Sequence, residues 1–161
     1  MAYPPYYIIK NELQQSLLAG ILQVVAQEQE YIRQIRDTKN EKSRKIELVL
    51  RPGLEKMGFS HSVTNRQYPL FAPGCLFEVD YFNPHLGAAI EIERSNLYTK
   101  VWLALVKLLE AKEIRHGLIM VPACRVFRNK PEASAEITYK RLRDGARNLL
   151  CHLDSLIVIG Y

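Results

Sequence analysis

Several features are scarce in this chain of 161 residues, and each shortage excludes a class of protein. The three cysteines, Cys75, Cys124 and Cys151, form no C-x-x-C pair, which argues against a disulfide framework and a zinc site. No apolar run reaches the roughly 18 residues of a transmembrane helix. The first residues also lack the pattern of a signal peptide. We therefore expect a cytoplasmic protein with no membrane partner.

Glycine-rich phosphate loops and histidine metal motifs are also missing. The glycines occur singly, as turn residues, so we expect no nucleotide cofactor. The four histidines show no spacing such as H-x-x-x-H, and such residues are more often turn or core residues than catalysts. We assign no role to His61, His85, His116 or His152.

The composition is that of an ordinary folded domain with excess positive charge. Hydrophobic residues make up 48% and charged residues 24% of the chain, and its length fits one domain over residues 1–161. We expect residues 1–37 to form an N-terminal extension helix and residues 38–161 a core. The net charge of +5 favours polyanionic partners, although many basic proteins never bind nucleic acid.

The N-terminal third is predicted to be helical. Apolar residues at helical spacing indicate one amphipathic helix over about Asn11 to Arg36, after an extended start. A capping-box pattern at residues 38–41 predicts a second helix, which Arg51-Pro52-Gly53 should interrupt.

The rest of the chain is predicted to alternate between strands and helices. In order, we expect strands within His61–Phe71, at Leu76–Phe82 and at Ala88–Glu93, a helix at Val101–Lys112, a strand at residues 118–121, a helix over about Pro131 to Leu153 and a strand at Ser155–Gly160. Because the helix after the third strand is a crossover, the third and fourth strands should be parallel. The predicted fold class is α/β: a mixed β-sheet with an α-β-β-β-α-β core, flanked by helices.

Three acidic residues stand near the ends of two adjacent predicted strands. Asp80 is on one strand, and Glu91 and Glu93 share one face of the next, so a hairpin would bring three carboxylates to one spot. Three ionised carboxylates repel one another unless a cation or protons neutralise them. Oxygen ligands without nearby cysteine or histidine favour Mg²⁺, with Mn²⁺ as a substitute. Such a metal can activate water for phosphodiester hydrolysis.

Acids two residues apart on a strand are also common on a solvated sheet face, and the spacing alone favours that interpretation. The flanking Ile90 and the helix that follows make a solvated face harder to build.

The pattern D80-x10-E91-x-E93 resembles the core signature of the PD-(D/E)XK nuclease superfamily. It departs from that signature because Val79 replaces a proline and Glu93 stands at the lysine position. A glutamate there is similar to BamHI-type enzymes, and EVDYFNPHLGAAIEIERSN followed by VWLALVKLLEA most resembles BglII-type restriction endonucleases. The resemblance implies that Asp80, Glu91 and the Ile92 carbonyl ligate Mg²⁺, and that Glu93 is a ligand or a general base.

The same resemblance points to auxiliary residues. The family often adds an acid from the helix before the strands, for which Glu47 is the candidate and Glu55 the rival. An exposed ion pair with a nearby arginine is an equal interpretation of Glu47. Some relatives recover the missing lysine from the following helix, so Lys107 and Lys100 are candidates, although such lysines more often lie on a solvated surface.

Polar residues around the acids are candidates for contacts with double-stranded DNA, since arginine and asparagine bind phosphates and base edges. The candidates are Asn65, Arg66, Arg94, Asn96, Arg125, Arg128 and Lys130. Local turns are an equal interpretation of Asn65 and Asn96. The long first helix leaves surface for a second subunit, and symmetric duplex sites favour a homodimer.

The sequence therefore supports a homodimeric, Mg²⁺-dependent endodeoxyribonuclease of the type II restriction class. Two alternatives remain. The chain is a nuclease-fold protein that only binds nucleic acid, or it is a structure-specific DNA repair nuclease.

Overall fold

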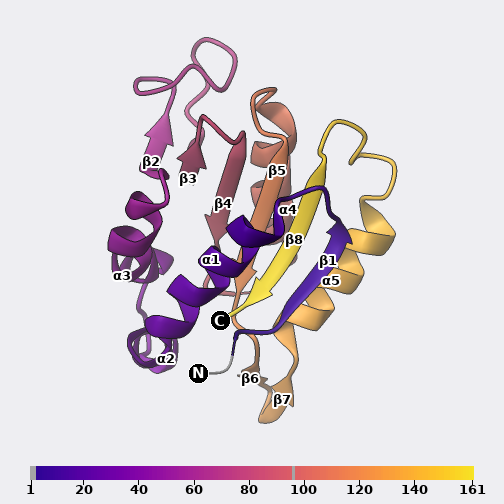
Figure 1. The fold of residues 1–161 in the computed structure, drawn as a ribbon. Coiled ribbons are helices and arrows are strands. Elements are labelled where there is room, and N and C mark those ends of the chain that lie inside the picture. The colour runs from indigo at the N-terminus through magenta and orange to yellow at the C-terminus, as the bar shows by residue number, and fades with distance from the viewer. Residues whose placement is uncertain (1–2, 96) are drawn as a thin grey trace.

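Six strands form one mixed sheet in the computed structural model, which describes residues 3–95 and 97–161 (Figure 1). The strands are β1 (Tyr6–Lys10), β2 (Ser60–Thr64), β3 (Glu78–Asn83), β4 (Ala88–Ile92), β5 (His116–Val121) and β8 (Ser155–Gly160). Their order across the sheet is β1-β8-β5-β4-β3-β2. β4, β5 and β8 are parallel, and the other pairs are antiparallel. The predicted α/β class and the parallel pair β4–β5 are confirmed.

Five helices cover the two faces of the sheet (Figure 1). They are α1 (Gln15–Gln27), α2 (Gln29–Asp37), α3 (Ser43–Lys56), α4 (Tyr98–Glu110) and α5 (Ser134–Gly145). The first three pack on one face and the last two on the other, so the sheet separates two apolar cores. Among the described residues, no helix is long and apolar enough to cross a membrane.

Alternate residues of the central strands point into different cores, as the pleat requires. On β4, Ile90 and Ile92 belong to the core under α1–α3, whereas Ala89 belongs to the core under α4 and α5. Glu91 has the parity of Ala89. A carboxylate is thereby directed from the middle of the sheet toward α4.

The N-terminal helices differ from the predictions in two ways. The predicted helix over residues 11–36 is two helices, because Glu28 leaves the helical conformation and the chain turns so that Ile32 packs into the core with α1 and α3. The predicted interruption at Pro52 is also wrong, since α3 continues through it. Gly53 lets α1 approach closely there: a Cβ would lie 2.6 Å from Val24 Cγ1. The capping-box prediction fails as well, because Lys42 precedes α3 without a side-chain cap.

The predictions missed three strands and placed the end of one helix too far along the chain. The extended start is the edge strand β1, which pairs with β8. The loop expected after β5 contains a hairpin of β6 (Arg125–Phe127) and β7 (Lys130–Glu132). Helix α5 ends at Gly145, well before Leu153, because residues 146–154 fold into turns that cover the core with Leu150.

Candidate active site

The β3–β4 hairpin opens at its far end, and two carboxylates occupy the opening. Backbone pairing between the strands ends at Tyr81 and Ile90. Beyond that point the Ile92 N–H donates to Asp80 Oδ2 at 2.6 Å, and the Asp80 N–H donates to Glu91 Oε1 at 3.3 Å. Side-chain oxygens thus take the place of ladder carbonyls. The predicted meeting of Asp80 and Glu91 is present.

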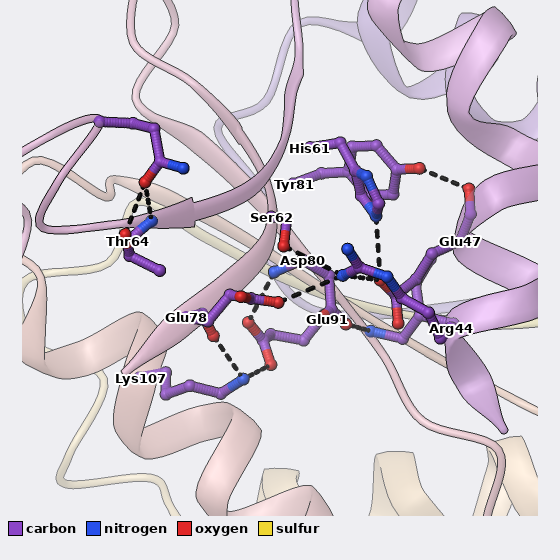
Figure 2. Close-up of polar contacts among 12 residues, drawn as sticks. Arg44, Glu47, His61, Ser62, Thr64, Glu78, Asp80, Tyr81, Glu91 and Lys107 are labelled. Atoms are coloured by element: carbon purple, nitrogen blue, oxygen red, sulfur yellow. Dashed lines mark hydrogen bonds and ion pairs between the residues drawn. The ribbon is translucent and has the colours of Figure 1, made fainter. Parts of the chain in front are cut away.

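Helix α4 supplies a cation beside Glu91. The Lys107 ammonium forms an ion pair with Glu91 Oε2 and donates to the Glu78 carbonyl at 2.9 Å (Figure 2). Its side chain is 13% exposed and that of Glu91 only 1%. Lys107, one of the two lysines predicted from this helix, therefore lies among the acids. Lys100, the other, lies beside Glu93 in a neighbouring hollow.

Glu47 reaches the site from α3 and is almost fully buried. Its Oε2 lies 3.0 Å from His61 Nε2 on β2 and accepts from Arg44 Nη1 at 3.1 Å (Figure 2). Both interpretations of Glu47 hold in part, since it pairs with an arginine and also faces the site. The rival Glu55 is bound to Arg51 on the exposed side of α3 instead.

Sequence reasoning missed His61. Its side chain is 4% exposed, and its ring lies against Tyr81 with centroids 4.9 Å apart. Tyr81 in turn donates its hydroxyl to the Glu47 carbonyl. The pairing of β2 with β3 across a connecting loop places His61 here, and no ligand spacing in the sequence signals it.

The carboxylates hold protons more tightly than exposed acids do. Burial, followed by repulsion from Glu47, raises the pKa of Asp80 from an ordinary value near 3.8 to about 7. Burial and the charge of Asp80 raise the pKa of Glu91 well above its usual range, and burial raises the pKa of Glu93. Burial lowers the pKa of Lys107, but Glu91, Asp80 and Glu93 together raise it more, so the ammonium stays charged. Additional positive charge next to Asp80, Glu91 and Glu93 would therefore stabilise their ionised forms.

Glu93 does not join the other two acids in a ready-made group. In the described ranges, no three histidine, cysteine, aspartate or glutamate side chains are arranged to hold a metal ion. Glu93 follows the last residue of β4 and lines a hollow of about 670 Å³ together with Lys100. Asp80 and Glu91 lie instead at the open end of the β3–β4 hairpin, which we call the β3–β4 fork. The open end of the hairpin thus holds two of the three predicted carboxylates, while Glu93 lies outside it and its charge still helps to raise the pKa of Asp80.

The two remaining carboxylates still fit a Mg²⁺ ion. They offer oxygen donors only, and burial makes them hold protons that a cation would replace. Mg²⁺ is usually bound by one or two carboxylates together with water and substrate phosphates, so a third acid is not required. The larger hollow between β1 and α5, about 760 Å³, contains neither carboxylate.

Comparison with models of known protein families identifies the family of this chain. Residues 6–161 match the family model described as "Putative halobacteria restriction endonuclease". The chain belongs to this family. No curated protein and no solved structure matches it. Membership in a restriction endonuclease family makes the buried acids of the β3–β4 fork the natural candidates for its active site.

Two residues of this family member that were predicted to contact DNA are engaged within the chain. The Asn65 amide binds the backbone of its own loop, accepting from Phe71 N–H at 2.8 Å and donating to two carbonyls. Arg94 donates to three backbone carbonyls, that of Arg36 in the last turn of α2 at 3.0 Å and those of Thr38 and Glu41 in the loop before α3. Both side chains hold loops together, as the alternative interpretation of Asn65 anticipated.

Arg66, Arg128 and Lys130, three further predicted DNA contacts, lie at the surface. Arg66 is exposed and lines a hollow next to β2. Arg125 is bound to Glu132 across the β6–β7 hairpin, whereas Arg128 and Lys130 are exposed at its tip and on β7. Asn96 lies outside the described residues. The role of each of these side chains in binding DNA stays a prediction.

Proposed function

We propose that this restriction endonuclease family member is a type II-like, Mg²⁺-dependent endodeoxyribonuclease that hydrolyses phosphodiester bonds of double-stranded DNA. We further propose that it belongs to the PD-(D/E)XK superfamily, near the BglII and BamHI types. The observation that carries the proposal is the buried pair of Asp80 and Glu91 in the β3–β4 fork. Two carboxylates with raised pKa values, bridged by backbone N–H groups, fit a site for a divalent cation.

The metal ligands are the acids of the fork. In our proposal Asp80, Glu91 and the Ile92 carbonyl hold Mg²⁺, which Mn²⁺ can replace. When bound, the ion polarises a phosphate oxygen and lowers the pKa of water. Lys107 fixes the orientation of Glu91 through their ion pair and keeps a positive charge next to the reacting phosphate. It is thus our candidate for the cation that the lysine position of β4 lacks.

Glu93 is our candidate general base. A base is most effective when its pKa is close to the working pH, and burial shifts the pKa of Glu93 upward toward that range. Lys100 lines the same hollow and would stabilise the ionised carboxylate. Glu47, which His61 and Arg44 hold in place, completes the acidic group on the α3 side.

The proposed partners are duplex DNA and a second copy of the chain, in the cytoplasm and without a nucleotide cofactor. The net charge of +5 supports binding of a polyanion, and the two-fold symmetry of duplex sites supports a homodimer.

Supercoiled plasmid incubated with the protein tests the proposal. We expect cleavage with Mg²⁺ or Mn²⁺, none with chelator, and none with an Asp80→Asn variant that still binds duplex. Discrete fragments indicate a site-specific enzyme, and random or structure-dependent nicks indicate a repair nuclease. Intact plasmid over a range of metal and salt concentrations contradicts hydrolysis and favours a protein that only binds nucleic acid.

A further inference from the structure

A basic hollow lies beside the acidic group, between α3 and β2. Its volume is about 500 Å³, and three arginines, Arg44, Arg51 and Arg66, are among the residues that line it. Of the described residues that line it, only Glu78 is acidic, and that carboxylate is already paired with Arg44 at 3.2 Å. The hollow therefore carries an excess of positive charge directly next to the carboxylates.

The three arginines differ in how far they are engaged. Arg44 uses a single nitrogen, Nη1, for its bonds to Glu47, Glu78 and Ser62. Arg51 is paired with Glu55, which does not line the hollow. The exposed Arg66 guanidinium has no hydrogen-bond or ion-pair partner in the described parts of the chain. Donors remain available on the wall of this hollow.

Ser62 adds a second, independent observation. It has a left-handed backbone conformation, with φ of 61°, inside β2, which is unfavourable for a residue other than glycine. The pairs on either side of it are His61 with Tyr81 and Val63 with Val79, so Ser62 stands opposite Asp80. Such strain gathers at functional sites. Here the conformation accompanies a hydroxyl on the wall of the hollow, next to Arg44.

The chemistry of the lining selects the ligand. Guanidinium groups donate hydrogen bonds and cannot accept them, and the Ser62 hydroxyl, which accepts from Arg44, has its own proton left to donate. The matching ligand is an anion with several acceptor oxygens, as a phosphodiester is. Glu78 is two residues from Asp80 along β3, a distance of about 7 Å. One strand of a duplex presents a phosphate about every 3.4 Å along the helix axis, so a separation of about 7 Å corresponds to one or two nucleotides.

We propose that this hollow binds a backbone phosphate of the substrate strand, one or two nucleotides from the phosphate that is cleaved. The inference rests on the proposed function and extends it by a second subsite. Phosphate contacts fix the register of a protein on a duplex without reading its sequence. By holding one phosphate in the hollow, Arg51, Arg66 and Ser62 help to align the phosphate that is cleaved with Asp80 and Glu91.

The test measures duplex binding without divalent metal, so that it is independent of cleavage. The affinity of a short fluorescein-labelled duplex is followed by anisotropy at several salt concentrations, for two unrelated sequences. Arg66→Gln and Arg51→Gln should each weaken binding about tenfold for both sequences. Each should also reduce the slope of log affinity against log salt by about 0.9. Arg143→Gln, on α5 in the opposite helical layer, is the matched control.

Ser62 variants separate the hydroxyl from the backbone strain. Ser62→Ala and Ser62→Gly both remove the hydroxyl, but glycine accepts the left-handed conformation without strain. We expect the same loss of affinity, about threefold, in both variants. Circular dichroism and thermal melting confirm that each variant is folded.

The outcomes distinguish this inference from the proposed function. Losses in Arg66→Gln and Arg51→Gln no larger than in Arg143→Gln overturn the subsite, even if the protein cleaves DNA with Mg²⁺. Losses confined to one duplex sequence also overturn it, because they indicate base readout. Sequence-independent losses with a reduced salt slope support the subsite, even in a protein that proves unable to cleave. A wild-type protein that binds no duplex contradicts both proposals.

Discussion

The two ends of β4 lie in one strand of five residues, yet they are built differently. At its start, Ala88–Ile90 pair with β3 on one side and β5 on the other, between two apolar layers. At its end, pairing continues only with β5, and the carboxylates of Asp80 and Glu91 complete the hydrogen bonds on the β3 side. The regular end is held by backbone pairing on both sides, whereas the open end is held on the β3 side by side-chain carboxylates with Lys107 beside them.

This difference shows how the fold builds a charged site inside a sheet. Burying carboxylates costs free energy unless hydrogen bonds and cations compensate. The regular half of β4 fixes the strand, so the other half can hold two acids, with Lys107 as the resident cation. We therefore expect changes at the open end to affect activity and pH dependence more than packing.

The largest expected effect comes from Asp80→Asn, which removes a proposed ligand but keeps the shape of the fork. Second-shell substitutions at metal sites cost up to about a hundredfold in activity, and loss of a ligand should exceed that. Plasmid cleavage with Mg²⁺ measures the rate. Asp144→Asn, an exposed acid of α5, should leave the rate unchanged. Equal rates in the Asp80→Asn and Asp144→Asn variants would show that the β3–β4 fork is not the active site.

The pH dependence of stability tests the acidic end by itself. In the metal-free protein, folded Asp80 keeps its proton up to about pH 7, whereas the unfolded chain loses it near pH 3.8. The unfolded state then binds fewer protons, so stability falls as pH rises between these values, by about 4 kcal/mol for this group. Urea unfolding with chelator, from pH 4 to 8, should show a smaller fall in Asp80→Asn. Identical slopes would contradict the raised pKa.

Lys107→Met tests the resident cation. Without Lys107, the Glu91 carboxyl is buried without its ion-pair partner, which should cost about 3 kcal/mol of unfolding free energy. The double variant Lys107→Met/Glu91→Gln should recover most of this loss, since neither charge remains. Chemical denaturation measures both, with the exposed Lys112→Met as the control. Additive losses in the double variant would show that the two side chains do not interact.

The smallest expected effect concerns the backbone after β4. The Tyr161 hydroxyl donates to the Glu93 carbonyl at 2.8 Å, so Tyr161→Phe should cost about 1 kcal/mol of stability. Thermal melting of Tyr161→Phe against the exposed Tyr31→Phe checks this. No difference between these two variants would mean that the hydrogen bond does not support the open end.

Local patterns in the sequence were enough to predict the regular part of the sheet. Alternation and turn residues located β3 and β4, and the crossover helix made β4 and β5 parallel. The hairpin connection then placed Asp80 near Glu91. These features depend on neighbours along the chain.

The features that were missed depend on contacts between distant elements. Glu47 and His61 meet only because α3 packs beside β2, and one helical periodicity could not reveal the turn at Glu28. Helix α3 passes Pro52 because burial of Leu50 and Leu54 on both sides outweighs the lost hydrogen bond. Which of the two candidate lysines would pair with Glu91 was likewise decided by the packing of α4.

The most direct measurement of the central claim is calorimetric titration of Mg²⁺ into the protein at pH 7, in two buffers that differ in heat of ionisation. The claim predicts uptake of the ion with release of protons, because a metal replaces the protons that Asp80 and Glu91 hold. It also predicts no uptake by Asp80→Asn or Glu91→Gln. Absence of uptake by the wild-type chain, or uptake that both variants retain, would contradict it.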